Sequence, residues 1–266
     1  MLTEVRNNIR YLFDALKISI KSAMAYKVSF LVQTIFMFFN NASFLIFWLV
    51  IFNHTGNSTD ITFNNVLYIW SFSSMGYGIA YFFFGGIQKI NEYIISGALD
   101  SYLLQPKNVL LNVATSKSSF AACGDILYGL VVAIMASGGD ISKIIFVILL
   151  SISGSIFFFA SEVFFRSIAV WLGDTNMIAN RYVEMLLITF STYPENIFGI
   201  GIKVILYTVV PVAYLSYIPA RLVENFNIWL LLLVILVAII YLAISILCFY
   251  KALRSYESGN SMAMKD

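Results

Sequence analysis

Few residues of this chain have types and spacings that could support catalysis. The only histidine is His54, which excludes a His-based metal cluster or a Ser/His/Asp triad within the chain. The sequence holds no G-x-x-x-x-G-K-S/T phosphate loop, no H-E-x-x-H and no C-x-x-C. Cys123 and Cys248 stand far apart in apolar segments, which indicates reduced packing residues. We therefore expect no catalytic residue, no metal site and no cofactor on this chain.

Three ionisable residues fall inside apolar segments, where charge is costly and a functional role is the default interpretation. Glu162 and Arg166 are spaced i, i+4 with the acid first, the favourable order for a helix-surface ion pair. Arg166 lies near the end of a long apolar segment, so we interpret the two as a structural pair. Asp125 lies about one turn inside its segment and is expected to reach the cytoplasmic interface. Neither the pair nor Asp125 is placed clearly at mid-membrane, where a proton-coupled carrier would need it.

The composition sets the class of protein that must position these residues. Of 266 residues, 60% are hydrophobic and 11% are charged, whereas soluble proteins carry roughly a quarter charged residues. Several apolar stretches reach the roughly 20 residues that cross a bilayer as a helix. Such spans use almost the whole chain, so any energy-converting module must be another polypeptide. The net charge of +2, with basic residues dispersed along the sequence, argues against a nucleic-acid partner.

We expect one all-α transmembrane domain, residues 1–266, with six spans. Residues 1–26 place apolar side chains at helical spacing between charged ones, which predicts an amphipathic helix in the membrane interface. The predicted spans are 28–52, 61–86, 118–136, 142–172, a broken stretch of about 177–218, and 227–250. Tryptophans lie near predicted span ends, as interface-seeking rings do: Trp48, Trp70, Trp171 and Trp229. For Trp70 the alternative is a packing residue deeper in its span.

The broken stretch allows two arrangements. It holds one apolar run at 182–192 and another at 199–218 that is interrupted by Pro211. Either the second run is the fifth span, or the first run crosses and the second forms a re-entrant segment before the last span. With both termini in the cytoplasm, few basic residues fall outside in either case: Lys143 and Arg221, joined by Lys203 in the re-entrant arrangement. The charge distribution therefore predicts a multi-pass protein of the cytoplasmic membrane with both termini inside.

The longest hydrophilic interval before the C-terminus, residues 87–117, is the most informative segment. Residues 87–97 predict a short amphipathic helix that is closed by Gly97. Apolar residues follow on a segment that should be cytoplasmic, among them Leu99, Leu103 and Leu104. Exposed apolar side chains of this kind indicate a partner surface. The alternative is that they pack back onto the membrane interface.

The same segment carries a family resemblance. The run Gly97-Ala-Leu-Asp-Ser-Tyr-Leu-Leu-Gln-Pro106 resembles the G-x-L-D-x-x-L-L-x-P signature of ABC-2 type permeases, the membrane subunits of ABC exporters. Tyr193-Pro194, the apolar run around Pro211, and Tyr217-Ile218-Pro219-Ala220 are similar to the pattern of that family before its last span. The resemblance covers essentially the whole chain.

The resemblance implies a six-helix permease with a cytoplasmic coupling helix that docks on an ATPase subunit. ATP and Mg would be bound by two such ABC ATPase subunits, and a second permease subunit would complete a homo- or heterodimer. The implied coupling residues are Ile90, Asn91, Glu92, Tyr93, Ile94, Gly97, Leu99, Asp100, Leu103, Leu104 and Pro106. The implied re-entrant segment holds Tyr193, Pro194, Pro211 and Pro219.

Polar and small residues within the spans indicate where helices associate in lipid, because association there depends on close packing and polar contacts. They are candidates for the permease interface or the transport path: Asn40, Asn41, Ser43, Ser71, Ser73, Ser74 and Gly76. The 24 Phe and 16 Tyr residues suit an amphipathic or lipophilic substrate. Two other functions stay open, an ion-coupled secondary transporter and a non-transporting membrane assembly subunit.

Overall fold

The computed structural model describes residues 14, 17–18, 21, 25–55 and 62–257. Helices make up most of this part of the chain, and it contains no strand, which confirms the all-α class. The amphipathic helix predicted for residues 1–26 falls mostly outside the described residues.

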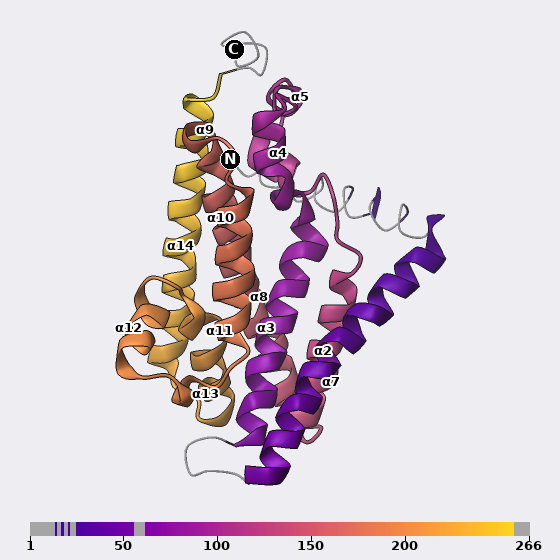
Figure 1. Cartoon of the computed structure of the whole chain (residues 1–266), viewed down its shortest axis with the longest axis vertical. Coiled ribbons are helices and arrows are strands. Elements are labelled where there is room, and N and C mark those ends of the chain that lie inside the picture. Colours follow the sequence, from indigo (N-terminus) through magenta and orange to yellow (C-terminus); the bar gives the residue numbers. More distant parts are fainter. Residues whose placement is uncertain (1–13, 15–16, 19–20, 22–24, 56–61, 258–266) are drawn as a thin grey trace.

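Long helices run through the body of the molecule (Figure 1). They are α2 (Lys27–Thr55), α3 (Phe63–Phe84), α7 (Ala122–Ser137), α8 (Ile141–Ser167), which α9 (Ala169–Leu172) continues, and α14 (Ile228–Arg254). Within the described residues, three are long and apolar enough to cross a membrane: Lys27–His54, Ile141–Leu172 and Ile228–Arg254. The bent pair discussed below would make a fourth.

Helix α3 lies at the centre of the bundle because small residues let its neighbours approach closely. A Cβ built on Gly76 would lie 3.2 Å from the carbonyl carbon of Gly154 in α8. On the side of α7, the Ser71 hydroxyl donates a 2.8 Å hydrogen bond to the carbonyl oxygen of Gly129. Close backbone approach at small residues is the usual way for helices to pack in lipid.

Helix α2 approaches the bundle at one close crossing with α7. A Cβ on Gly124 would lie 2.4 Å from the carbonyl oxygen of Thr34 and 2.8 Å from the Cβ of Met37. The N-terminal part of α2 leans away from the other helices (Figure 1). Most of its large apolar side chains are exposed, including Phe36 and Phe39.

The stretch between α9 and α14 is broken into short elements. They are α10 (Asn176–Asn180), the π-helix η2 (Arg181–Ile188), α11 (Thr189–Ser191), η3 (Glu195–Ile197), α12 (Ile200–Thr208), the π-helix η4 (Ala213–Tyr217) and α13 (Ile218–Glu224). In Figure 1 the segment from α10 to α11 runs lengthwise through the bundle, whereas α12 and α13 lie together near one end. The α12 helix and the following Ala213–Glu224 helix are bent by 82°. The break holds Pro211, which has no N–H to continue a helix.

The opposite end of the bundle carries the predicted coupling segment. Short elements follow α3 here: η1 (Gly85–Lys89), α4 (Ile90–Ile95), α5 (Asp100–Leu103) and α6 (Val109–Ala114). Figure 1 places α4 and α5 at the same end as α9 and the C-terminal end of α14. Gly97 ends the short helix with a φ of 73°, a conformation that glycine adopts without strain.

Candidate functional site

The predicted coupling residues divide into a buried and an exposed group. Ile90, Asn91, Ile94 and Leu99 are almost completely buried within this chain. The expectation that Leu99 is exposed for a partner is therefore wrong. Ile90, Asn91 and Ile94 occupy the buried face of the six-residue helix α4, and Leu99 follows that helix.

The exposed group forms a small apolar surface at the end of the bundle. Ile95 is 44% exposed, Leu103 38% and Leu104 87%. Glu92 and Pro106 are also exposed. We call these five residues the end surface. A hydrogen bond from Lys89 holds the pKa of Glu92 below its usual value, so this carboxylate stays charged at neutral pH.

The remaining coupling residues shape the segment. Gly97 ends α4, and Asp100 is the first residue of α5. The ring of Tyr93 lies 5.1 Å from that of Tyr102, which packs the two short helices against each other. The end surface is therefore held on a folded support.

Asn91 joins α4 to the connection between α9 and α10. Its side-chain amide donates a 2.9 Å hydrogen bond to Asp174. The side-chain oxygen of Asn91, Oδ1, accepts a hydrogen bond from the backbone N–H of Thr175 at 3.0 Å and another from the Thr175 hydroxyl at 3.1 Å. The backbone N–H of Asn176 and the Asn91 amide both lower the pKa of Asp174. The coupling segment and the start of α10 are thus linked by a buried polar contact.

Glu162 and Arg166 form the predicted ion pair, and the pair is buried, with side-chain exposures of 2% and 4%. The hydroxyl of Tyr81 donates a 2.6 Å hydrogen bond to Glu162. The guanidinium also donates to Asn176 at 2.6 Å and to Asn180 at 2.7 Å. Partners therefore surround both charges, and the network connects α3, α8 and α10.

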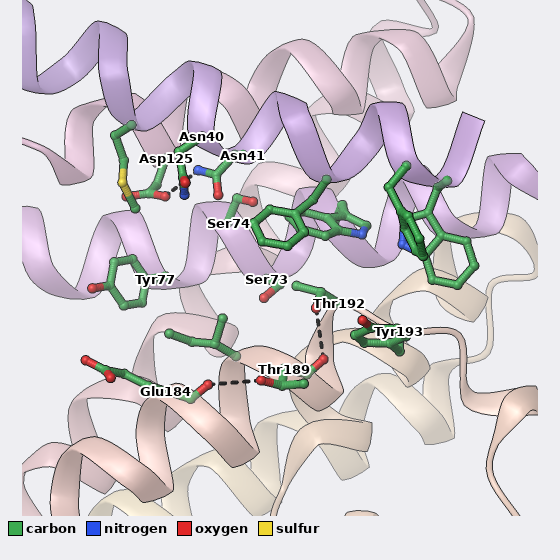
Figure 2. Close-up of a pocket in the computed structure, with 16 residues that line it drawn as sticks. Asn40, Asn41, Ser73, Ser74, Tyr77, Asp125, Glu184, Thr189, Thr192 and Tyr193 are labelled. Atoms are coloured by element: carbon green, nitrogen blue, oxygen red, sulfur yellow. Dashed lines mark hydrogen bonds between the residues drawn. The ribbon is translucent and has the colours of Figure 1, made fainter. Parts of the chain in front are cut away.

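A pocket of about 500 Å³ lies between α2, α3, α7 and the segment from η2 to Tyr193 (Figure 2). Four predicted path residues line it: Asn40, Asn41, Ser73 and Ser74. The hydroxyl of Ser73 lies 2.6 Å from that of Ser191 in α11, a hydrogen bond that ties α3 to the opposite wall.

Three other predicted path residues do not line this pocket: Ser43, Ser71 and Gly76. The Ser43 hydroxyl donates to the carbonyl oxygen of Asn40 in its own helix, at 2.6 Å. Gly76 and Ser71 serve the helix crossings of α3 described above. These three residues therefore have packing or local roles within this chain.

The expectation that Asp125 reaches the cytoplasmic interface is wrong. Its side chain is only 3% exposed and lines the pocket. Its Oδ1 atom accepts a 2.6 Å hydrogen bond from the Asn41 amide, as the dashed line in Figure 2 shows. Helix α2 packs directly on the neighbouring Gly124 in the first turn of α7, which contributes to the burial of Asp125.

The predicted re-entrant residues are placed around the far end of the molecule. Tyr193 lines the pocket, with its ring 5.7 Å from that of Trp48. Pro194, Pro211 and Pro219 are buried. Nearby, Glu195 pairs with Arg221 and accepts a 3.0 Å hydrogen bond from Tyr207, so polar contacts hold α12 and α13 to the η3 turn.

Several pocket residues were not among the sequence candidates. They are Met37, Phe44, Phe47, Tyr77, Glu184, Ile188, Thr189 and Thr192, and four more lining residues were given other roles: Trp48, Trp70, Asp125 and Tyr193. Glu184, Ile188 and Thr192 are spaced four residues apart, which places them on one face of a helix over the 182–192 run. That spacing could have identified them as lining residues. Trp48 and Trp70 are buried within the chain, so both rings pack against protein, as the alternative interpretation of Trp70 predicts.

Comparison with protein families gives a match over most of the chain. The family model described as "ABC-2 family transporter protein" matches residues 37–260. The match includes the coupling segment, every described pocket residue and the broken stretch. Comparisons with curated proteins and with solved structures found no match. Because the family model covers most of the chain, this multi-pass membrane protein belongs to the ABC-2 family of transporter proteins.

Proposed function

We propose that this chain is the permease subunit of an ATP-driven exporter in the cytoplasmic membrane. Separate ABC ATPase subunits would bind ATP and Mg and supply the driving force. The observation that carries the proposal is the end surface, an exposed apolar patch with a charged rim on a segment that is packed onto the bundle. Apolar centres with polar rims are typical of protein interfaces.

The proposed topology has six crossings, α2, α3, α7, α8, the α10–α11 segment and α14. Their alternating directions in Figure 1 support it. In this arrangement the end surface and the end of α14 face the cytoplasm. The α12–α13 hairpin then re-enters from outside, which would make 182–192 the fifth crossing and 199–218 part of the re-entrant segment.

The proposed mechanism moves the pocket wall through the polar contacts of the cytoplasmic end. Closure of the ATPase subunits would push on the end surface. Asn91 transmits that displacement to Thr175, and Arg166 ties Asn176 and Asn180 to α8. Helix η2 follows directly after Asn180 and carries Glu184 into the pocket. The movement of η2 would open the pocket alternately toward the two sides of the membrane.

A second permease subunit, identical or different, is proposed to complete the path beside α2. The exposed apolar side chains of α2, among them Phe36, Phe39 and Ile46, support a protein or lipid contact on that face. The substrate proposed for the complete path is amphipathic or lipophilic.

Replacing Leu104 with aspartate tests the docking of the ATPase. We expect at least ~30-fold weaker co-purification of the ATPase, because a central apolar contact typically contributes about 2 kcal/mol or more. The matched control is Ile141→Asp, which places the same charge on an exposed aliphatic residue at the opposite end of the bundle. It should retain the ATPase.

Equal loss or equal retention in both variants would contradict docking at the end surface. Leu99→Asp is not a useful variant, because it would place a charge in the core. Transport that continues in vesicles without any ATPase would instead support an ion-coupled carrier.

A further inference from the structure

The described pocket carries two carboxyl side chains at one end and aromatic rings at the other. In Figure 2, Asp125, Glu184 and Tyr77 gather at one end, and Tyr193 and Thr192 lie toward the other. No lysine or arginine is among the described residues that line the pocket. Its carboxylates therefore lack a cationic neighbour in the lining.

Asp125 has an oxygen atom that the protein does not satisfy. Oδ1 accepts from Asn41, but the buried Oδ2 atom has no hydrogen-bond partner among the described residues. An unmet buried carboxylate oxygen costs free energy. A ligand that brings a positive charge would remove this cost, whereas an anion would add to it.

The other end of the pocket suits an apolar body. The rings of Phe44 and Trp70 stack with centroids 5.6 Å apart, and those of Trp48 and Tyr193 meet edge to face at 5.7 Å. Aromatic faces attract cations as well as apolar groups. The pocket volume of about 500 Å³ lies within the range of small-molecule sites.

We infer that the pocket binds a lipophilic cation, with the positive centre at Asp125 and Glu184 and the apolar body against the aromatic end. The inference rests on the proposed function for its role in transport, since it specifies the charge of the substrate. Binding itself requires only this chain.

The test compares two ions of equal shape and opposite charge. Tetraphenylphosphonium and tetraphenylborate are titrated into the purified full chain in nanodiscs of zwitterionic lipid, and tryptophan fluorescence is followed. Trp48 and Trp70 line the pocket and report occupancy. We expect saturable binding of the phosphonium and at least ~10-fold weaker binding of the borate. At a desolvated site the carboxylates attract the cation and repel the anion.

The charge preference must depend on the pocket carboxylates. We expect Asp125→Asn and Glu184→Gln each to weaken phosphonium binding about 5-fold or more, and the double variant to remove most of the preference. The control is Glu224→Gln, which removes an exposed carboxylate outside the pocket lining. Circular dichroism and thermal unfolding of each variant establish that it is folded.

Equal binding of both ions, or a preference that survives in a folded double variant, would overturn the inference. Such a result would not contradict the proposed function as an ATP-driven permease, because the assay contains no ATPase. Conversely, loss of the proposed ATPase docking would leave the binding result standing.

Discussion

Replacing Arg166 with methionine is expected to lower the free energy of unfolding by about 3–5 kcal/mol, the usual cost of leaving one member of a buried ion pair uncompensated. Glu162 would keep its hydrogen bond from Tyr81 but lose its cation, in a site where its side chain is 2% exposed. Asn176 and Asn180 would also lose their donor. The measurement is thermal or denaturant unfolding of the purified chain in detergent.

Two further variants distinguish a lost charge pair from a general disturbance. Adding Glu162→Gln to Arg166→Met removes the uncompensated charge and preserves an acceptor for Tyr81, so it should recover part of the stability. Lys89→Met breaks the exposed pair with Glu92 and should change stability little. An Arg166→Met variant that unfolds like the unmodified chain would refute this account of the network.

Replacing Gly86 with alanine is expected to disrupt the packing of the coupling segment. A Cβ at this position would lie 2.0 Å from the carbonyl oxygen of Val113 and 2.9 Å from that of Ala114. These are backbone atoms, so η1 and α6 must separate. We expect the free energy of unfolding to fall by about 1–3 kcal/mol or more, the usual cost of overpacking a tight contact. We also expect weaker retention of the ATPase.

The matched control for this variant is Gly201→Ala. Nothing lies within 4 Å of a Cβ built on Gly201, which is also in a helix. Alanine is the better helix former there, by up to about 1 kcal/mol, so this variant should be neutral or slightly stabilising. If the Gly86 and Gly201 variants behave alike in unfolding and co-purification, the close contact of η1 with α6 does not matter.

The sequence predicted the helical class and four residues of the pocket, because those features depend on local composition. Asn40, Asn41, Ser73 and Ser74 stood out as polar residues in apolar helices, and all four line the pocket. The run of helices follows the predicted apolar segments with small shifts, such as the start of α7 at Ala122 instead of residue 118.

The errors concern which element covers a given side chain, and local pattern contains no such information. Leu99 looked like a partner contact, but the core of this chain covers it. Asp125 looked close to the interface, but α2 crosses directly over its turn. Glu184 was missed because the 182–192 run was considered only as an apolar segment; the residue lies in the π-helix η2 and lines the pocket. Each error involves residues that are distant in sequence.

The leaning of α2 has a consequence for how the pocket fills. Phe44 and Phe47 belong to the pocket lining yet are 50% and 51% exposed, on the helix whose N-terminal part leans away from the others. A molecule dissolved in the acyl-chain region could enter the pocket laterally, past these rings, without passing through water. Occupancy would then follow partitioning into the leaflet, so apparent affinity would change with the volume of lipid supplied per protein.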